Sequence, residues 1–321
     1  MILPHLYGKL DSKDFFIYAA CDEKYFDEYG AVIINSVRQN TSSHLHIHIF
    51  NPRDDQLTLI ADIPNLSISY EYVALDAFCI AADKWNEYSS SDIKYEIRRQ
   101  LKNVSKRLCN SIPNGKISDK LSAIIRKFEN QTDIEYSRYK KIVSCVKQNH
   151  DESIHDRIRK TYYACARFIR LHQLLDHSAS FLAIDVDCVV RKKIILLPLN
   201  YDFYFYRKSG VNARFLAGGL YCNQTTKSRD FLNEYSNILL KNIQNDYLYW
   251  GLDQDALEDI VPKYNWGALP ISYIDWFMQQ DSLIWSAKGQ RKKLNSFVAE
   301  QDKYRTLRKS EHPNQSLNYT L

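Results

Sequence analysis

The chain lacks the features that mark several common classes of protein. None of its seven cysteines forms a C-x-x-C pair, which argues against a disulfide framework or a zinc site and favours a reducing, cytosolic setting. No stretch approaches the roughly 18 apolar residues that span a bilayer, and the N-terminus lacks the basic start and apolar run of a signal peptide. Only nine glycines occur in 321 residues, and none builds a G-x-G-x-x-G or Walker-type phosphate loop. We therefore expect a cytoplasmic globular protein that does not cradle phosphate in a glycine-rich turn.

What is present is an ordinary globular composition with an uneven charge. Hydrophobic residues make up 45% and charged residues 25% of the chain, which is enough for a real core. Of the net charge of +5, residues 84–150 hold 15 lysines and arginines against 7 acids, so the rest is net acidic. Helical spacing within 83–150 predicts a basic helical insertion. Two interpretations stay open: a solvated helical pair, or a surface for anionic lipid headgroups or an acidic glycan. No nucleic-acid-binding motif accompanies the charge.

Strand and helix patterns alternate along the first part of the chain. Three β-branched or aromatic runs at 15–21, 44–50 and 66–73 predict strands, and helical patterns separate them. This order is typical of a doubly wound sheet that binds nucleotides. The second run, HLHIHIF, places its three histidines on one face, which we interpret as a polar face packed under a helix. Further helices are expected at 161–175 and 228–240, further strands at 181–184, 201–206 and 215–222, and a loosely held polar tail from residue 300.

The stretch FLAIDVDCVV at 181–190 is the most informative of the chain. Its first four residues predict a buried strand, and Asp185 and Asp187 follow one residue apart. Residues i and i+2 of an extended segment point to the same side, so both carboxylates can face one hard cation. Ligands of open α/β sheets collect at the carboxyl ends of the strands, where this pair falls. The alternative is an ordinary strand end with two solvated acids.

Three later segments offer further candidate positions. Ala217-Gly218-Gly219 interrupts the strand pattern at 215–222, which indicates close approach of a ligand or another backbone. Asp253-Gln254-Asp255 opens a short helix, where acids also suit the positive helix N-terminus. The basic segment 284–293 surrounds Gly289 and suits phosphate binding.

Six short patterns in this order resemble the GT-A glycosyltransferases, most closely those of family 8. The patterns are AACDEKY at 19–25, YACARFIRL at 163–171, FLAIDVDCVV at 181–190, FLAGGLYCN at 215–223, DQDAL at 253–257 and SAKGQRK at 286–292. The resemblance covers most of residues 15–293 apart from the insertion. It implies a single α/β domain over 1–300, a Rossmann-like, mixed and mainly parallel sheet with helices on both faces, and a polar tail at 301–321.

The resemblance also implies a function and a set of site residues. It implies transfer of a sugar from a nucleotide-sugar donor, with a UDP-sugar expected, to a glycan or lipid-linked acceptor, with retention of configuration. It implies that Asp185 and Asp187 bind Mn²⁺ or Mg²⁺. The donor-binding residues that it implies are Ala20, Asp22, Tyr25, Arg167, Asp185, Ala217, Gly218, Gly289 and Lys292. The implied catalytic residues are Asp253, Gln254 and Asp255.

Two departures from the family pattern keep other functions open. Ser286 stands where the family has a metal-ligating histidine, and Leu216 replaces an asparagine. An alternative interpretation is therefore a catalytically impaired protein that binds a nucleotide sugar or another partner. A phosphatase with an aspartate nucleophile also carries D-x-D after an apolar strand, but normally on the first strand. The sugar, the base, the acceptor and the oligomeric state are not encoded in these motifs.

Overall fold

The structure is a computed structural model, and it describes residues 1–12, 14–74, 76–81, 154–175, 179–208 and 214–306. The chain divides into two compact units: one holds residue 1, 74–162 and 242–250, and the other holds the remainder. In the first unit, the N-terminal ammonium of Met1 forms an ion pair with Asp246 at 2.7 Å. The predicted basic insertion at 83–150 lies outside the described residues. No helix among the described residues is long and apolar enough to cross a membrane.

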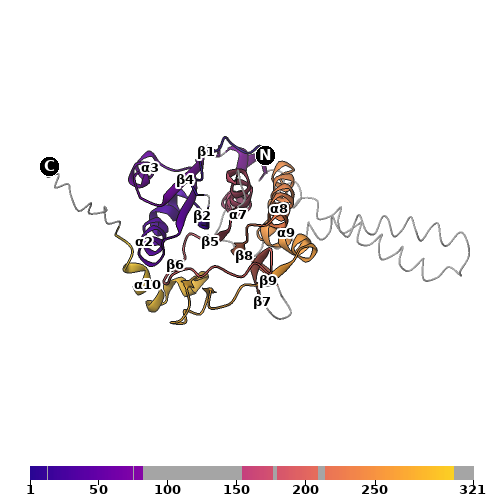
Figure 1. The fold of residues 1–321 in the computed structure, drawn as a ribbon. Coiled ribbons are helices and arrows are strands. Elements are labelled where there is room, and N and C mark those ends of the chain that lie inside the picture. Colours follow the sequence, from indigo (N-terminus) through magenta and orange to yellow (C-terminus); the bar gives the residue numbers. More distant parts are fainter. Residues whose placement is uncertain (13, 75, 82–153, 176–178, 209–213, 307–321) are drawn as a thin grey trace, which may run out of the picture. The chain divides into compact units, whose positions relative to one another are not determined.

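The second unit is built on an eight-stranded sheet with the order β1-β4-β3-β2-β5-β8-β7-β9. Neighbouring strands run parallel from β4 through β3 and β2 to β5, while β8 runs antiparallel to both β5 and β7. Figure 1 shows β2, β5 and β8 together in the sheet. The strands are β1 (Tyr7–Gly8), β2 (Phe16–Asp22), β3 (His44–Phe50), β4 (Leu66–Glu71), β5 (Phe181–Asp185), β7 (Phe203–Lys208), β8 (Arg214–Cys222) and β9 (Trp266–Ala268). The expected mixed and mainly parallel sheet is confirmed.

Helices cover both faces of this sheet because its central strands are apolar on both sides. On one face, Ile33 and Val37 of α2 (Ala31–Asn40) pack with Ile17 and Ile47. On the other face, the Tyr18 hydroxyl donates to the backbone oxygen of Arg167 at 2.7 Å. Arg167 belongs to α7 (Ile154–Leu174), which begins seven residues earlier than its sequence pattern indicates. The remaining helices of this unit are α1 (Glu23–Tyr25), α3 (Asp54–Ile60), α8 (Thr226–Gln244), α9 (Leu252–Ile260) and α10 (Asn295–Asp302).

The three histidines of β3 lie on the face that α7 covers, as the alternation predicts. They form a continuous hydrogen-bonded ladder with two serines of β4. His44 bonds Ser67, His46 bonds both Ser67 and Ser69, and His48 bonds Ser69, at 2.7–2.9 Å. His46 also stacks on Tyr18, with ring centroids 5.9 Å apart. The interpretation as a packed polar face is confirmed.

After Asp187 the chain enters a second sheet, which has three strands. Its order is β10-β11-β6, from β10 (Ile274–Asp275), β11 (Ile284–Trp285) and β6 (Val189–Val190). Helix α10 packs Phe297 into a cluster with Val32, Val189 and Trp285. Tyr304, expected in a loose tail, is buried, and its hydroxyl accepts from Asn40 Nδ2 at 2.9 Å. The tail prediction is therefore wrong for the first residues after 300, because α10 and Tyr304 close the apolar side of α2.

Strand β8 continues through Gly218 and Gly219, but its pairing is irregular there. Gly219 pairs with Ile184 of β5, whereas the register with β7 shifts between Leu220, which pairs with Phe205, and Phe215, which pairs with Arg207. Gly218 and Gly219 thus lie at a register shift within a continuous strand. They are small for steric reasons, since a Cβ atom on Gly219 would lie 2.8 Å from Ile274 Cδ1.

Candidate functional site

The candidate site lies at the carboxyl ends of β2 and β5, where polar side chains follow two buried parallel strands. Ala20 of β2 is the register partner of Asp185 of β5. Asp22, the last residue of β2, caps α1, and its Oδ1 accepts from the backbone N–H of Tyr25 at 2.9 Å. The parallel register thus brings three of the predicted donor-binding positions to one edge of the sheet, together with Tyr25.

Arg167 links the first aspartate to β8. Its Nη1 donates to Asp185 Oδ1 at 2.7 Å and its Nη2 donates to the backbone oxygen of Ala217 at 3.1 Å. The side chain of Arg167 is only 12% exposed, so this is an internal ion pair rather than a surface one. Gly218 is required here because a Cβ atom would collide with Asp185 Oδ2. These contacts bring together four residues that the sequence motifs singled out.

Lys292 binds the second aspartate from the C-terminal segment. Its Nζ lies 2.5 Å from Asp187 Oδ2. The same ammonium lies 5.0 Å from the ring centroid of Tyr25 and 5.2 Å from that of Tyr29, within the range of cation–π attraction. Tyr29 was not predicted. It is placed by a π-helical turn at Phe26–Gly30, and such turns are frequent at functional sites.

The two aspartates differ in electrostatic state. Burial alone raises the pKa of Asp185, but Arg167, Lys288 and Lys292 outweigh burial and hold that pKa below its ordinary value. Burial, and then the negative charge of Asp185, raise the pKa of Asp187. The pKa of Lys292 is raised by Asp187 against the effect of its own burial, so the ammonium keeps its proton. The two carboxyl groups thus differ in the direction of their pKa shifts, and each is paired with a cation of the chain, Asp185 with Arg167 and Asp187 with Lys292.

Two buried oxygen atoms of the site have no hydrogen-bond partner within the described residues. They are Asp187 Oδ1 and Ser286 Oγ. Ser286 is 1% exposed and follows β11, next to the β6 strand that the aspartates lead into. Buried polar atoms are normally satisfied by protein groups, water or an ion, so these two oxygens are available to a bound group. Together with Asp185 Oδ2, these oxygens match the hard donor set that Mg²⁺ or Mn²⁺ prefers.

The protein supplies few other metal ligands here. No group of three or more histidines, cysteines and acids within reach of one ion occurs among the described residues. A metal at Asp185 and Asp187 would thus rely on two carboxylates, the Ser286 hydroxyl and oxygen atoms from outside the chain.

The predicted catalytic residues fall into two groups. Asp253 is buried, with its Oδ2 3.7 Å from Arg167 Nη2, and its Oδ1 accepts from the Gln254 N–H at 2.9 Å. Burial raises the pKa of Asp253 and outweighs the opposing effect of Arg167. Asp255 instead forms an ion pair with Arg214 at the start of β8. Residues two apart on a helix point in different directions. Asp253 therefore faces Arg167, while Asp255 faces Arg214.

The C-terminal segment contributes more positive charge than its motif indicated. Lys288 lowers the pKa of Asp185 by its charge, and it lies next to the predicted residue Gly289. Gly289 has φ = +57° and open space where a side chain would stand, and it begins a 3-10 turn over Gly289–Lys293. The signal for Lys288 was present in SAKGQRK, but that run holds three basic residues and only the fold distinguishes them.

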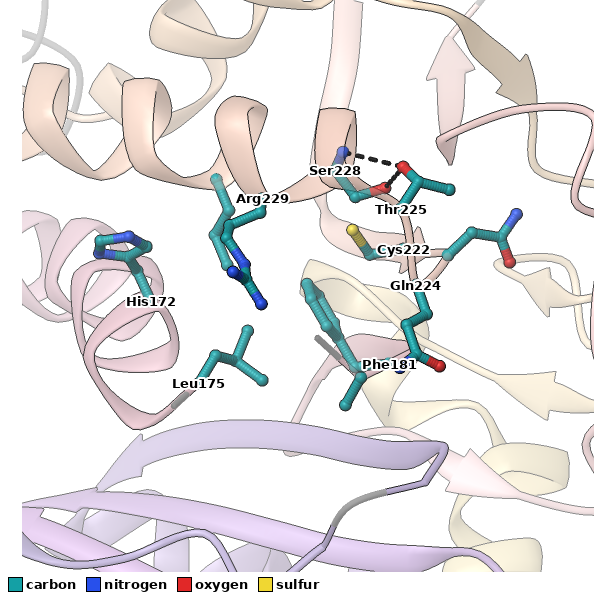
Figure 2. Close-up of a pocket in the computed structure, with 11 residues that line it drawn as sticks. His172, Leu175, Phe181, Cys222, Gln224, Thr225, Ser228 and Arg229 are labelled. Atoms are coloured by element: carbon teal, nitrogen blue, oxygen red, sulfur yellow. Dashed lines mark hydrogen bonds between the residues drawn. The ribbon is translucent and has the colours of Figure 1, made fainter. Parts of the chain in front are cut away.

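A cavity of about 130 Å³ lies elsewhere on the same unit. Figure 2 shows His172 of α7, Arg229 of α8 and Phe181 around it. Phe181 is the first residue of β5 and Asp185 the last, so the cavity opens at the opposite end of the strand. It is not part of the aspartate site.

Comparison with known proteins finds similar chains among solved structures but not among sequences. The chain matches no protein-family model and no curated protein sequence. It is similar to the galactosyltransferase LgtC in complex with donor and acceptor sugar analogs, with 11% identity and a TM-score of 0.45 over 91% of this chain and 97% of that one. It is also similar to the glycosyltransferase GlyE of Streptococcus pneumoniae TIGR4, with 12% identity and a TM-score of 0.46 over 93% and 61%. A third is the apo form of mouse xyloside xylosyltransferase 1, with 10% identity and a TM-score of 0.40 over 87% and 99%. At these identities and TM-scores the likenesses carry no argument about function, which rests on the site itself.

Proposed function

We propose that the chain is a glycosyltransferase that moves a sugar from a nucleotide-sugar donor, a UDP-sugar in our expectation, to a hydroxyl of a glycan or lipid-linked acceptor. The observation that carries this proposal is the buried, unpartnered Oδ1 of Asp187 just beyond the carboxyl end of β5, with the buried hydroxyl of Ser286 following β11. Arg167 and Lys292 pair with Asp185 and Asp187, Lys288 lowers the pKa of Asp185 by its charge, and Gly218 makes room for Asp185. A site with this composition suits an anionic group bridged through a divalent cation.

The cations of the chain suit a diphosphate leaving group. Breaking the bond between the sugar and the diphosphate leaves negative charge on the β-phosphate, and fixed positive charge nearby lowers the barrier. Lys292 and Lys288 lie on the C-terminal segment and, with Arg167, supply that charge. A divalent metal held by Asp185 and Asp187 would add Lewis-acid stabilisation of the same charge.

In this proposal Asp253 orients the sugar rather than attacking it. A retaining reaction through a covalent intermediate needs a carboxylate nucleophile, and the central residue of the D-Q-D motif is Gln254, a weak nucleophile. Asp253 is held by Arg167 and by a backbone N–H, which suits hydrogen bonding to sugar hydroxyls. We therefore propose front-face attack. The acceptor oxygen bonds the anomeric carbon, the bond to the diphosphate breaks with its electron pair, and the acceptor proton passes to the leaving phosphate.

Substitution of Asp187 by asparagine tests this function. Asp187→Asn keeps the shape of the side chain but removes its charge, so donor turnover should fall by at least about a hundredfold while the far-UV circular dichroism spectrum is unchanged. Asp281→Asn is the matched control, because that aspartate is fully exposed. Turnover is measured as nucleoside diphosphate release from a set of nucleotide sugars. Full activity in Asp187→Asn would remove this carboxylate from the mechanism.

One observation favours a second function, binding of a nucleotide sugar without transfer. Each aspartate is already paired with a fixed cation of the chain, Asp185 with Arg167 and Asp187 with Lys292. Calorimetric binding of a nucleotide sugar with neither transfer nor hydrolysis would identify that case. Release of phosphate from a generic phosphomonoester would instead point to the phosphatase alternative.

A further inference from the structure

The segment after β6 presents aliphatic side chains to solvent. Ile195, Leu196 and Leu199 are 64%, 62% and 74% exposed, although they lie within five residues of each other. Ile194 and Leu197 of the same segment face inward and pack on the core beneath the sheet. We call residues 194–199 the aliphatic loop. Single exposed leucines are common on proteins, but three in such a short stretch form a patch that calls for an explanation.

The aliphatic loop is held in place by hydrogen bonds to its backbone. Three tyrosines of the surrounding strands and turns make them: the Tyr273 hydroxyl donates to the Ile195 oxygen at 2.5 Å, the Tyr204 hydroxyl donates to the Pro198 oxygen at 2.7 Å, and the Tyr221 hydroxyl accepts from the Leu197 N–H at 3.2 Å. Asn223 Nδ2 also donates to the Pro198 oxygen, at 3.0 Å. The outward direction of the aliphatic side chains is thus fixed by the fold.

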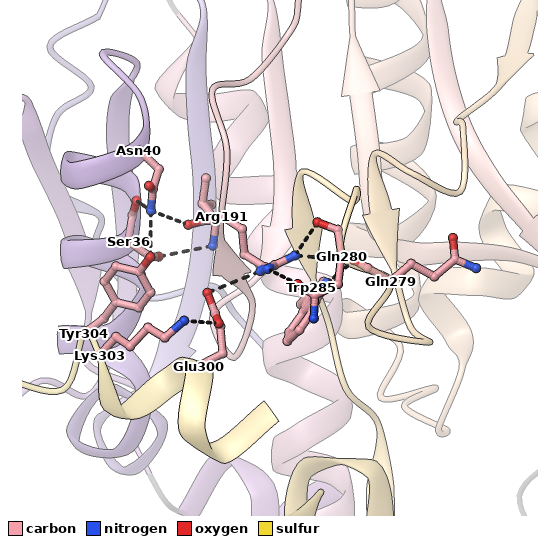
Figure 3. Close-up of polar contacts among 10 residues, drawn as sticks. Ser36, Asn40, Arg191, Gln279, Gln280, Trp285, Glu300, Lys303 and Tyr304 are labelled. Carbon is pink, nitrogen blue, oxygen red and sulfur yellow. Dashed lines mark hydrogen bonds and ion pairs between the residues drawn. The ribbon is translucent and has the colours of Figure 1, made fainter. Parts of the chain in front are cut away.

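Arg191, which precedes the aliphatic loop, is also held in place by several contacts. Arg191 Nε donates to Glu300 Oε1 of α10 at 3.2 Å, and its guanidinium lies 3.8 Å from the ring centroid of Trp285. Figure 3 shows this arginine between Glu300 and Gln280, and its Nη1 donates to the Gln280 backbone oxygen at 3.0 Å. Beyond it, Lys193 is exposed and Lys192 is only loosely paired, 3.6 Å from the fully exposed Asp281.

We propose that the aliphatic loop, with Lys192 and Lys193, docks this protein on the surface of an anionic phospholipid bilayer. Exposed aliphatic side chains enter the boundary between headgroups and acyl chains, and neighbouring lysines pair with anionic headgroups. Protein interfaces are instead enriched in aromatic residues, methionine and arginine and depleted in lysine, so the composition of this patch favours a membrane over a protein partner. The proposal does not depend on glycosyl transfer, although it would place the site near a lipid-linked acceptor.

Vesicle sedimentation of the full chain tests the proposal. The probes are phosphatidylcholine vesicles with and without 30 mol% phosphatidylglycerol. The test variant is the triple substitution Ile195→Ser, Leu196→Ser, Leu199→Ser, and the control is Leu59→Ser, which removes a 54% exposed leucine from α3. We expect the wild type and the control to sediment with the anionic vesicles, and the sedimented fraction of the triple variant to fall at least fivefold.

The charge-reversal variant Lys192→Glu, Lys193→Glu gives an independent measurement and carries the test if the triple variant does not fold. It should show the same loss on anionic vesicles. Equal sedimentation of wild type and variants would overturn the proposal, as would equal binding to neutral and anionic vesicles or no binding at all. A wild-type dimer in size-exclusion chromatography that the triple variant dissolves would assign the loop to a second copy of the chain instead.

Discussion

Ser286 and Ser36 are two buried serines whose hydroxyls differ in one respect. Ser36 Oγ accepts from the Val190 N–H at 3.2 Å and donates to the Ile33 oxygen at 3.1 Å. Ser286 Oγ has no hydrogen-bond partner among the described residues. A buried hydroxyl without a partner destabilises the fold, while a satisfied one stabilises it. From this difference we expect Ser286 to interact with a bound ligand and Ser36 to stabilise the fold.

Alanine at these two positions should therefore have opposite effects. Ser286→Ala is expected to leave the free energy of unfolding unchanged or slightly raised, whereas Ser36→Ala should lower it by about 1 to 2 kcal/mol. With manganese and a nucleoside diphosphate present, Ser286→Ala should lose part of the stabilisation that the ligands give to the wild type. Urea unfolding with and without ligands measures both effects. A large loss in Ser286→Ala without ligands would make that hydroxyl structural.

Lys292 and Lys293 offer a matched pair of adjacent lysines. Lys292 contacts Asp187 and two tyrosine rings, while Lys293 is exposed. Loss of a charge-assisted contact to phosphate costs about 1.5 to 3 kcal/mol, so Lys292→Ala should weaken nucleoside diphosphate binding by roughly 10- to 100-fold. Lys293→Ala should bind like the wild type. Isothermal titration calorimetry measures both, and equal affinities would remove Lys292 from the site.

At the scale of elements, the histidine ladder joins β3 to β4 and makes their pairing sensitive to pH. Burial, and then the charge of His44, lower the pKa of His46 to about 3, and burial lowers the pKa of His48 well below its ordinary value. Both rings are therefore neutral in the folded state, with each nitrogen of His46 bonded to a serine. Protonation would place positive charge on rings that are buried between the sheet and its covering helix, which burial disfavours.

The sign of the pH effect follows from proton binding. Below the ordinary histidine pKa of 6.5 the unfolded chain binds protons that the folded chain excludes, so stability falls as pH falls. Each excluded proton contributes a slope of about 1.4 kcal/mol per pH unit, down to about pH 3 for His46. Urea unfolding between pH 7.5 and 5 measures this slope. His46→Gln should reduce it, and an unchanged slope would assign the pH dependence to other groups.

The sequence predicted the central elements well because their patterns are dictated by burial on both faces. The runs at 15–21, 44–50 and 181–184 became β2, β3 and β5 within a residue or so. Errors arose where tertiary contacts overrode local signals. Gly218 and Gly219 looked like an interruption of β8, but only the register with β7 shifts there while the strand itself continues, with Asp185 and Ile274 against the two glycines. The residues after 300 looked like a tail because most of them are polar. The burial of Tyr304 depends on a contact with Asn40, which lies far away in the sequence.

At the scale of the whole molecule, the site is assembled from segments more than 250 residues apart. Short motifs predicted Asp22, Arg167 and Lys292 as members of one site, and the structure places Arg167 against Asp185 and Lys292 against Asp187. They did not predict which acid of D-Q-D faces the site, since Asp253 and Asp255 differ only in helical direction and Arg214 holds the latter. Nor did they indicate Tyr29, which depends on a π-helical turn without a sequence signature.

Ligand binding should stabilise the whole molecule, because the site joins strands near the N-terminus to the C-terminal segment. A ligand at a hundred times its dissociation constant adds about 2.7 kcal/mol to the free energy of unfolding, which for a chain of this size raises Tm by roughly 4 °C. We expect this shift for one nucleoside diphosphate in the presence of manganese or magnesium, and a smaller one without metal. Differential scanning fluorimetry of uridine, guanosine and adenosine diphosphates, each with metal or chelator, identifies the base. A shift equal with and without metal would mean that Arg167, Lys288 and Lys292 hold the diphosphate by themselves, while no shift with any nucleotide would contradict the donor site.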